Sequence, residues 1–366
     1  MFYMKGKVTR QAHVDIPEGT VEEEYGRAGF AGRYAHLYRT RPPVEWTAIE
    51  GDLRPWAVRA QELPGLGEGD YLSGRVTFAW NEDVALHMSH IDEAMPYCFR
   101  NGDGDEVLFV HVGAGRIETD FGPLRYERGD YLVIPRGTVY RLLPDEATRL
   151  LVIETRGEVD LPPKGILGQH ALFDPAVINV PEPAPVEDDG RSEWQLKVQR
   201  RGRLTTITYP YHPINVVGWK GDLTVWQLNV RDIRPVLSDR YHLPPTAHAT
   251  FMANNVVICT FLPRPLETGD PKALKVPFYH SNIDYDEVLF YHDGDFFSRE
   301  GIAPGMVTIH PAGLPHGAQP GAVKAAEGKT RTLEQAVMID TVNPLTVTEK
   351  AQMTAWTDYW TSWQPK

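Results

Sequence analysis

The sequence is poor in cysteine, in positive charge and in long apolar runs. Its 366 residues include two cysteines, Cys98 and Cys259, which lie far apart in apolar, strand-like surroundings. This argues against a disulfide framework or a thiolate metal site and favours buried thiols in a reducing cytoplasm. Lysine and arginine number 37 against 49 aspartates and glutamates, and the formal net charge of -12 opposes binding to nucleic acid or to anionic membranes.

Long apolar segments are missing as well. No stretch approaches the length of a membrane span, and the first fifteen residues lack the apolar core of a secretory signal. We therefore expect a globular cytoplasmic protein whose partner is a small molecule or another protein. The 30 prolines and 32 glycines are spread in short turn-like clusters, which interrupt the chain too often for long helices and favour mainly β structure.

Two segments have helical character. Residues 22–38 (EEEYGRAGFAGRYAHLY) favour a helix, and near the end of the chain Met353, Trp356, Trp360 and Trp363 recur at helical spacing. That second pattern predicts a C-terminal helix with one face packed on the core. Between them, from Cys98 onward, short β-rich runs alternate with turns, as expected of antiparallel strands.

An internal repeat organises the chain. DEVLFVHVG (residues 105–113) is followed by RGDYLVIPRGTVY (128–140), and DEVLFYHDG (286–294) is followed by PGMVTIHPAGLPH (304–316). In both copies Asp-Glu opens an apolar strand that ends in glycine, and a second glycine precedes a strand that ends in Pro-x-Gly. Two copies of one β-barrel unit explain this order.

The second copy carries a set of metal-ligand side chains. His280 and Glu287 lie on one predicted hairpin, and His316 follows a Pro/Gly-shaped turn. Alternate side chains of a small barrel point inward, so the three can converge on one point. Two imidazoles and one carboxylate on one side of an ion form the ligand set of non-haem Fe(II) oxygenases, although Mn, Co or Ni suit the same ligands. The spacing resembles the two-part cupin signature.

The first copy lacks two of these ligands. Phe99 stands at the position of His280 and Tyr140 at that of His316, whereas Glu106 matches Glu287. We expect this barrel to hold no metal. The chain is therefore divided into three predicted parts: residues 1–160 with the degenerate metal-free barrel, residues 161–195 as a proline-rich and acidic linker, and residues 196–366 as the metal-carrying barrel with the C-terminal helix.

Further motifs extend over most of the chain. They are YGRAGF (residues 25–30), HPINVVGWKG (212–221), HLPPTAH (242–248), FLPRP (261–265) and FYHSN (278–282). With them the chain resembles the homogentisate 1,2-dioxygenase family. The resemblance implies a bicupin fold, Fe(II) held by His280, Glu287 and His316, and cleavage of the ring of homogentisate or a closely related carboxylated hydroquinone with both atoms of O2, in aromatic catabolism. It also implies trimers or hexamers.

Five further residues are candidates for roles at the site, three of them by resemblance. A base must take the phenolic proton, and His242 is the first candidate, with His248 in reserve. His310 is expected to donate a hydrogen bond to the substrate. Tyr279 and His292 flank the ligands and are additional candidates for substrate contact.

Three alternatives remain at this stage. The first is a dioxygenase of the same fold acting on another hydroquinone or an aminophenol, such as gentisate. The second is a bicupin isomerase that uses another divalent metal, and the third is a non-catalytic bicupin with a storage or regulatory role. An intact ligand set beside a degraded one disfavours the third, since storage alone gives no reason for the asymmetry.

Overall fold

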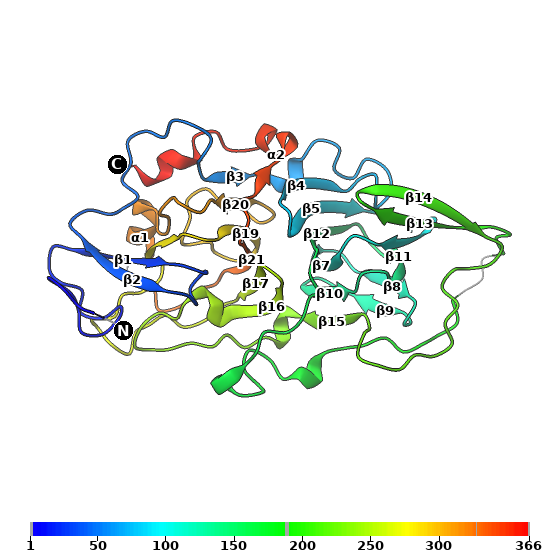
Figure 1. The fold of residues 1–366 in the computed structure, drawn as a ribbon, viewed down its shortest axis with the longest axis horizontal. Helices are drawn as coiled ribbons and strands as arrows, with labels where there is room; N and C mark the ends of the chain where they lie inside the picture. Colours follow the sequence, from blue (N-terminus) through cyan, green and yellow to red (C-terminus); the bar gives the residue numbers. More distant parts are fainter. Residues whose placement is uncertain (1–2, 187–189, 327, 365–366) are drawn as a thin grey trace.

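The computed structural model describes residues 3–186, 190–326 and 328–364, and most of the ordered elements are strands. Two strand-rich halves lie side by side (Figure 1), which confirms the mainly β, bicupin-type prediction. Among the described residues the α-helices are α1 (Pro320–Ala326) and α2 (Glu349–Met353). No helix in these ranges has the length and apolar character to cross a membrane.

The first half consists of two facing sheets. One has the strand order β15 (Trp226–Asn229), β10 (Asp130–Ile134), β7 (Asp105–Val112), β12 (Thr148–Thr155), β5 (Val84–Ile91), β4 (Val76–Trp80) and β22 (Thr346–Val347). The other has the order β14 (Arg203–Tyr209), β13 (Trp194–Arg200), β6 (Cys98–Asn101), β11 (Val139–Pro144), β8 (Gly115–Thr119) and β9 (Leu124–Tyr126). Both cysteines are free and buried, as predicted.

The second half is smaller and carries the predicted ligands. Its main sheet has the order β16 (Ala249–Ala253), β17 (Val256–Phe261), β21 (Gln335–Thr341), β19 (Asp286–Asp293), β20 (Val307–His310) and β3 (Trp56–Val58). A second sheet contains β18 (Tyr279–Asn282), β1 (Val21–Gly26) and β2 (Tyr34–Arg39).

Strand pairing crosses the predicted boundaries at residues 160 and 195. Strands β13, β14 and β15 belong to the first half, because β13 pairs with β6 and β15 pairs with β10. In the other direction, β3 pairs with β20 of the second half, where Figure 1 shows the blue strand beside the orange one. The division into domains is therefore not the simple sequential one that the repeat suggested, since the pairing of strands depends on contacts distant in sequence.

The predicted linker contains little regular structure. Its described residues hold two short 3-10 turns, Gly165–Leu167 and Pro175–Val177, and Phe173 between them is buried in the core. Glu187, Asp188 and Asp189 of the acidic run lie outside the described residues. The linker stays a prediction.

The predicted helix over residues 22–38 is wrong. This segment forms the hairpin of β1 and β2, and β1 pairs in parallel with β18. Buried Glu23 is held from both sides, by the guanidinium of Arg39 and by the hydroxyl of Ser281. Tertiary pairing of this kind overrides the helical preference of a glutamate-rich segment.

The C-terminal helix is also different from the prediction. Helix α2 ends at Met353, and a separate 3-10 turn spans Tyr359–Trp363. Trp363 is fully buried, but Met353 is 73% exposed. The aromatic residues therefore pack on the core from the 3-10 turn and from Trp356 before it, and not from one continuous helical face.

Equivalent residues of the two repeats meet where the halves contact. Phe109 of β7 and Phe290 of β19 are partners in a T-shaped contact at 6.2 Å. Beside them Nδ1 of His111 lies 2.9 Å from Nδ1 of His292. The amide of Gln61 lies 3.3 Å from Nε2 of His111, so that nitrogen accepts and the His111 Nδ1–H donates to His292. The two barrels thus pack through the same surface of each, as in a two-fold dimer.

Because of this histidine pair, we expect the protein to lose stability in mild acid. Burial, helped by nearby Arg128, lowers the pKa of His111 to about 4, and burial together with His111 lowers that of His292 to about 3. Unfolded histidines take up protons below about pH 6.5. The stability is therefore present above about pH 6.5 and is lost as the pH falls toward the folded pKa values.

Urea unfolding at about pH 7 and about pH 5 measures the effect. We expect the His111→Leu, His292→Leu double variant to lose less free energy of unfolding over this interval than the natural protein. His170→Leu, at an exposed histidine, is the matched control. An unchanged pH dependence in the double variant would contradict the argument.

Candidate metal centre

The three predicted ligands come together in the second half. His280 lies on β18, Glu287 on β19, and His316 follows the turn after β20. His280 and His316 form a two-way backbone bridge, in which each amide donates to the other residue's carbonyl at 2.9 and 2.8 Å. The bridge holds their rings 4.1 Å apart between centroids. All three side chains are buried.

A glycine makes this bridge possible. Gly317 follows His316 with a φ of +130°, and a Cβ at this position would lie 2.1 Å from the carbonyl oxygen of Phe278. Any larger residue would push the His316 segment away from the strand that carries His280.

Both histidines direct Nε2 at the carboxylate. Nε2 of His280 lies 3.7 Å and Nε2 of His316 lies 3.6 Å from Oε2 of Glu287. Their Nδ1 atoms face backbone carbonyl oxygens, that of Phe278 at 3.4 Å and that of Leu314 at 3.2 Å. Because a carbonyl only accepts, Nδ1 carries the proton and each Nε2 presents a lone pair.

The arrangement fits a divalent metal ion. Neither Nε2 has a hydrogen-bond partner among the described residues, although both are buried. Buried lone pairs that face a carboxylate with no cation between them are costly. Two atoms that each lie about 2.1 Å from one ion are at most about 4.2 Å apart, and the observed separations are within this limit. The three ligands leave the opposite side of the ion open.

The charges of the three side chains also favour binding of a metal ion. Burial lowers the pKa of His280, so its imidazole is neutral. Burial alone would raise the pKa of Glu287, but the surrounding histidines outweigh it and hold this pKa well below its usual value. The neighbouring Asp286 is not available as a ligand, because its two carboxylate oxygens accept from the backbone amides of Ala312 and Leu345.

His310 forms a hydrogen bond with the second carboxylate oxygen of Glu287, Oε1. Its Nδ1 lies 2.8 Å from Oε1 of Glu287, and its Nε2 lies 3.3 Å from the hydroxyl of Tyr359. Burial lowers the pKa of His310 to about 3, so the neutral ring donates through Nδ1 and accepts through Nε2. Both nitrogens are used within the protein, so His310 orients Glu287. The predicted hydrogen bond to substrate has no donor left on this ring.

A cavity of about 100 Å³ opens beside the ligands. His280 and Glu287 line it together with apolar side chains, two arginines and His248. Its lining residues are Leu243, Pro245, His248, Phe261, Arg264, Val276, Pro277, Phe278, His280, Glu287, Leu289, Phe297, Ser298, Arg299, Gly317, Glu334 and Met338. A metal at the wall of a partly apolar cavity with a few polar groups is the usual form of a small-molecule site.

His242 is fully buried and does not line this cavity. Its ring stacks on Phe278 at 4.0 Å, and Phe278 forms part of the cavity wall. Nδ1 of His242 donates to the carbonyl oxygen of Leu274 at 3.1 Å, which leaves a lone pair on Nε2 without a partner among the described residues. The reserve candidate His248 does line the cavity, and burial lowers its pKa to about 3.

Tyr279 and His292 lie away from the cavity. Tyr279 packs against a cluster that includes Val44 and Trp363. His292 contacts His111 where the barrels meet. Strand alternation places Tyr279 on the opposite face from its neighbour His280, so the substrate contacts predicted for Tyr279 and His292 find no support in these positions.

The first barrel replaces the ligand set with a buried ion pair. Glu106 stands at the position of Glu287, and its oxygens accept from the guanidinium of Arg75 at 2.7 Å and from the hydroxyl of Tyr140 at 2.7 Å. Phe99 and Tyr140 are cross-strand partners, as His280 and His316 are in the second half. The Arg75 cation offsets the charge of Glu106, which supports the prediction that this barrel holds no metal.

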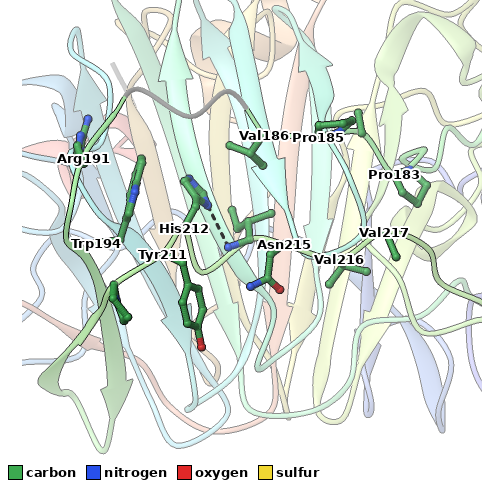
Figure 2. A pocket seen from close by; sticks show the side chains of 13 residues that line it. Pro183, Pro185, Val186, Arg191, Trp194, Tyr211, His212, Asn215, Val216 and Val217 are labelled. Carbon is green, nitrogen blue, oxygen red and sulfur yellow. Dashed lines mark hydrogen bonds between the residues drawn. The ribbon is translucent and has the colours of Figure 1, made fainter.

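A larger hollow lies on the first half, at about 530 Å³ (Figure 2). Trp194 and His212 line it, and Nδ1 of His212 accepts from the amide of Ile214 at 3.0 Å. Its described lining contains one histidine and no carboxylate or thiol, so these residues offer no metal site.

Sequence comparison assigns the family. A family model for the N-terminal part of homogentisate 1,2-dioxygenase matches residues 60–230. A protein of Saccharolobus solfataricus that carries the name of a dioxygenase is 33% identical over 361 residues, which cover 93% of this chain and 93% of that protein. The chain belongs to the homogentisate 1,2-dioxygenase family. It is therefore an enzyme of the dioxygenase class, as the sequence predicted.

Two further similar proteins share less sequence identity with this chain. The homogentisate 1,2-dioxygenase of Rhodopseudomonas palustris strain HaA2 is 28% identical, over 86% of this chain and 73% of its own length. Among solved structures, a cupin 2 conserved barrel domain protein from Leptotrichia buccalis aligns with 74% of this chain and 89% of its own, at 12% identity and a TM-score of 0.30.

Two arginines at the cavity of this homogentisate 1,2-dioxygenase family member were not predicted from the sequence. Arg264 and Arg299 both line the cavity and are 8% and 9% exposed. Arg299 donates to the carbonyl oxygen of Gly317 at 2.7 Å, whereas Nη1 of buried Arg264 has no partner among the described residues. Arg264 lies within the FLPRP motif, so that motif was the available signal.

Proposed function

We propose that this protein is an Fe(II)-dependent ring-cleaving dioxygenase that acts on homogentisate or a closely related carboxylated hydroquinone. The observation that carries the proposal is the convergence of two lone-pair nitrogens and one carboxylate oxygen at the wall of a cavity that also contains arginine. Mn, Co and Ni suit the same three ligands, so iron rests on the family and on this ligand set.

The bound metal would bring the ring and dioxygen together and relay electron density between them. His280, Glu287 and His316 would hold it from one side. His310 fixes Oε1 of Glu287, which keeps Oε2 directed at the ion. Phe261, Phe278 and Leu289 on the cavity wall would exclude water from the reacting ring.

Arg264 is the proposed partner of the substrate carboxylate. Its guanidinium presents two parallel N–H donors, the geometry that a carboxylate accepts. A buried Nη1 without a partner gains the most from such a ligand, because its desolvation is already complete in the free protein. Arg299 is less available since Gly317 and Ser298 accept its hydrogen bonds.

The base that takes the phenolic proton is one of two histidines. His242 has a lone pair on Nε2 but lies behind Phe278, whereas His248 is part of the cavity wall. We retain His242 as the predicted base, and a comparison of His242→Gln with His248→Gln decides between them. The base is the residue whose loss lowers kcat and removes the acidic limb of the pH profile.

Cytoplasmic location and assembly into trimers or hexamers complete the proposal. Two free, buried cysteines suit a reducing compartment. Val217, in the family motif at residues 212–221, is 98% exposed, and Val216 beside it is also exposed. Apolar residues presented in this way support a contact between copies of the chain.

Oxygen consumption tests the proposed function. Metal-free protein is reconstituted with Fe(II) without oxygen and is then given oxygen with homogentisate, gentisate or unsubstituted hydroquinone, while the absorbance of a ring-opened product is followed. We expect uptake with homogentisate to exceed uptake with unsubstituted hydroquinone. Uptake with gentisate alone would retain the reaction and change the substrate. Bound iron without uptake would point to an isomerase or a non-catalytic bicupin.

The same assay tests the carboxylate site. Arg264→Met is expected to raise KM for homogentisate at least tenfold and to leave KM for unsubstituted hydroquinone nearly unchanged, because a charged hydrogen bond contributes about 1.5 to 3 kcal/mol. Arg231→Met removes an arginine from the exposed surface and serves as the matched control. Equal increases in KM for both substrates would refute the role of Arg264.

A further inference from the structure

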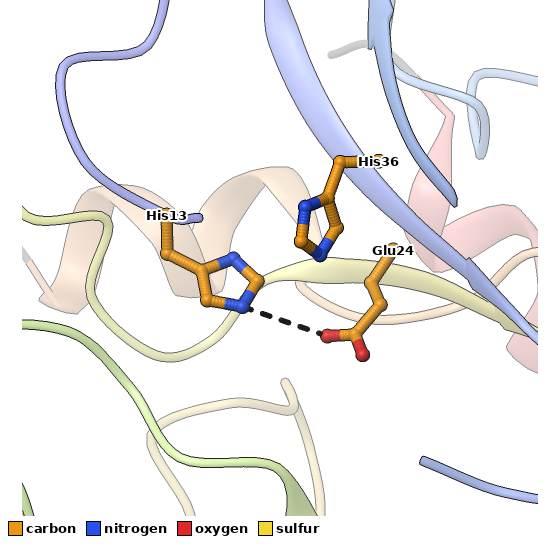
Figure 3. Close-up of side chains that lie close together, drawn as sticks. All are labelled: His13, Glu24 and His36. Atoms are coloured by element: carbon orange, nitrogen blue, oxygen red, sulfur yellow. Dashed lines mark ion pairs between the residues drawn. The ribbon is translucent and has the colours of Figure 1, made fainter. Parts of the chain in front are cut away.

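A second group of metal-ligand side chains lies outside the site described above. His13 precedes β1, Glu24 lies on β1 and His36 lies on β2. Each offers one ligand atom, and the three atoms lie within 4.8 Å of one another. Figure 3 shows the three side chains directed toward a common point, with the ion pair between His13 and Glu24 drawn as a dashed line. Glu24 and His36 are cross-strand partners, so the pleat places them on one face.

The histidine is oriented as a metal ligand. Nδ1 of His13 lies 2.5 Å from Oε1 of Glu22, and Nε2 of the same ring lies 3.8 Å from Oε2 of Glu24. With Nδ1 donating to a carboxylate, Nε2 turns its lone pair toward Glu24 and His36. Histidines that bind metals usually donate their other N–H to a carboxylate in this way.

The backbone holds His13 in an unfavourable conformation. Its φ is +63°, in the left-handed region that costs energy for a residue with a Cβ. Hydrogen bonds fix the segment on both sides, from the amide of Leu274 to the His13 carbonyl at 2.7 Å and from the amide of Asp15 to the Lys272 carbonyl at 3.0 Å. Such conformations persist where the position of a side chain matters.

Charge also favours a cation at this point. Glu22 and Glu24 lie near each other on one strand with little solvent access. The two carboxylates share His13 as their partner, and a divalent ion in the group would add positive charge beside them.

We propose that His13, Glu24 and His36 bind a second divalent metal ion, of the borderline class that prefers nitrogen with oxygen, such as zinc. A small side-chain rotation brings the three atoms within reach of one ion. Glu24 is also the strand partner of His280, so the ion would fix the β1–β2 hairpin beside the strand that carries a ligand of the first site. His13 contacts the His242 ring at 3.8 Å, and the ion would hold the N-terminal segment over that histidine.

Metal stoichiometry tests the proposal without reference to activity. Protein stripped with a chelator is titrated with Zn(II) against a chromophoric competitor, and bound metal is measured by mass spectrometry. We expect two ions per chain for the natural protein, one for His36→Ala, one for His316→Ala and none for the double variant. His170→Ala, at an exposed histidine away from both groups, is the matched control and should keep two.

Two results would overturn the second site. One is a natural protein that binds a single ion together with a His316→Ala variant that binds none. The other is a His36→Ala variant that folds, by circular dichroism, and still binds two ions. If His36→Ala does not fold, the His316→Ala variant decides alone, because a remaining ion supports the second site and its absence excludes it.

Discussion

Replacing His316 by alanine is expected to remove one bound metal ion per chain and to abolish oxygen uptake. His316 contributes one of two nitrogen lone pairs at the centre, and its Nε2 is buried without another partner among the described residues. Loss of one of three ligands leaves a carboxylate and one imidazole, which bind a divalent ion weakly. Bound iron by mass spectrometry and oxygen consumption with homogentisate are the measurements.

The equivalent position of the first barrel provides the control. Tyr140→Phe removes the hydroxyl that donates to Glu106 but retains the ring. We expect unchanged iron and activity with a loss of about 1.5 to 3 kcal/mol in the free energy of unfolding. Equal loss of iron from the two variants would contradict the assignment of the centre to the second half.

Arg75→Met is expected to destabilise the protein by about 3 to 5 kcal/mol without changing its metal content. Arg75 is buried beside Glu106 and Glu154, with nitrogen to oxygen distances of 2.7 and 3.6 Å. Glu154 keeps Arg156 as a partner, but Glu106 is left with the Tyr140 hydroxyl alone. A buried carboxylate without a counter-charge accounts for the cost, which denaturant unfolding measures.

A second substitution separates charge from packing. Adding Glu106→Gln to Arg75→Met removes the uncompensated charge and should restore part of the lost stability. Arg125→Met breaks an exposed ion pair with Asp145 and should cost less than about 1 kcal/mol. If the double variant is less stable than Arg75→Met, the ion-pair explanation fails.

The repeat made the main features of the His280, Glu287 and His316 site predictable from the sequence. Two copies of one strand pattern, one with His280, Glu287 and His316 and one with Phe99, Glu106 and Tyr140, indicated the fold and the three side chains that the structure brings together. Inward positions on a barrel strand recur with a period of two. The spacing of residues along the chain therefore determines which side chains point into the barrel.

The groups around the ligands were harder to predict. Arg264 and Arg75 reach their sites from segments outside the two copies of the repeat. His310 uses its nitrogens within the protein although its spacing suggests a substrate contact. The helix expected at residues 22–38 failed for the same reason. Its residues pair with β18, more than 250 positions away, and local composition carries no information on such a partner.

The exchange of edge strands between the two halves bears on how the chain is made. The seven-stranded sheet of the first half is closed at one edge by β22, at residues 346–347, while β3, at residues 56–58, closes the main sheet of the second half. During synthesis the first barrel therefore gains its last strand only after nearly the whole polypeptide has been made. Likewise, β3 stays unpaired until β20 has been synthesised. A nascent chain released early would expose both open edges, and neither half would be a self-sufficient unit for expression alone.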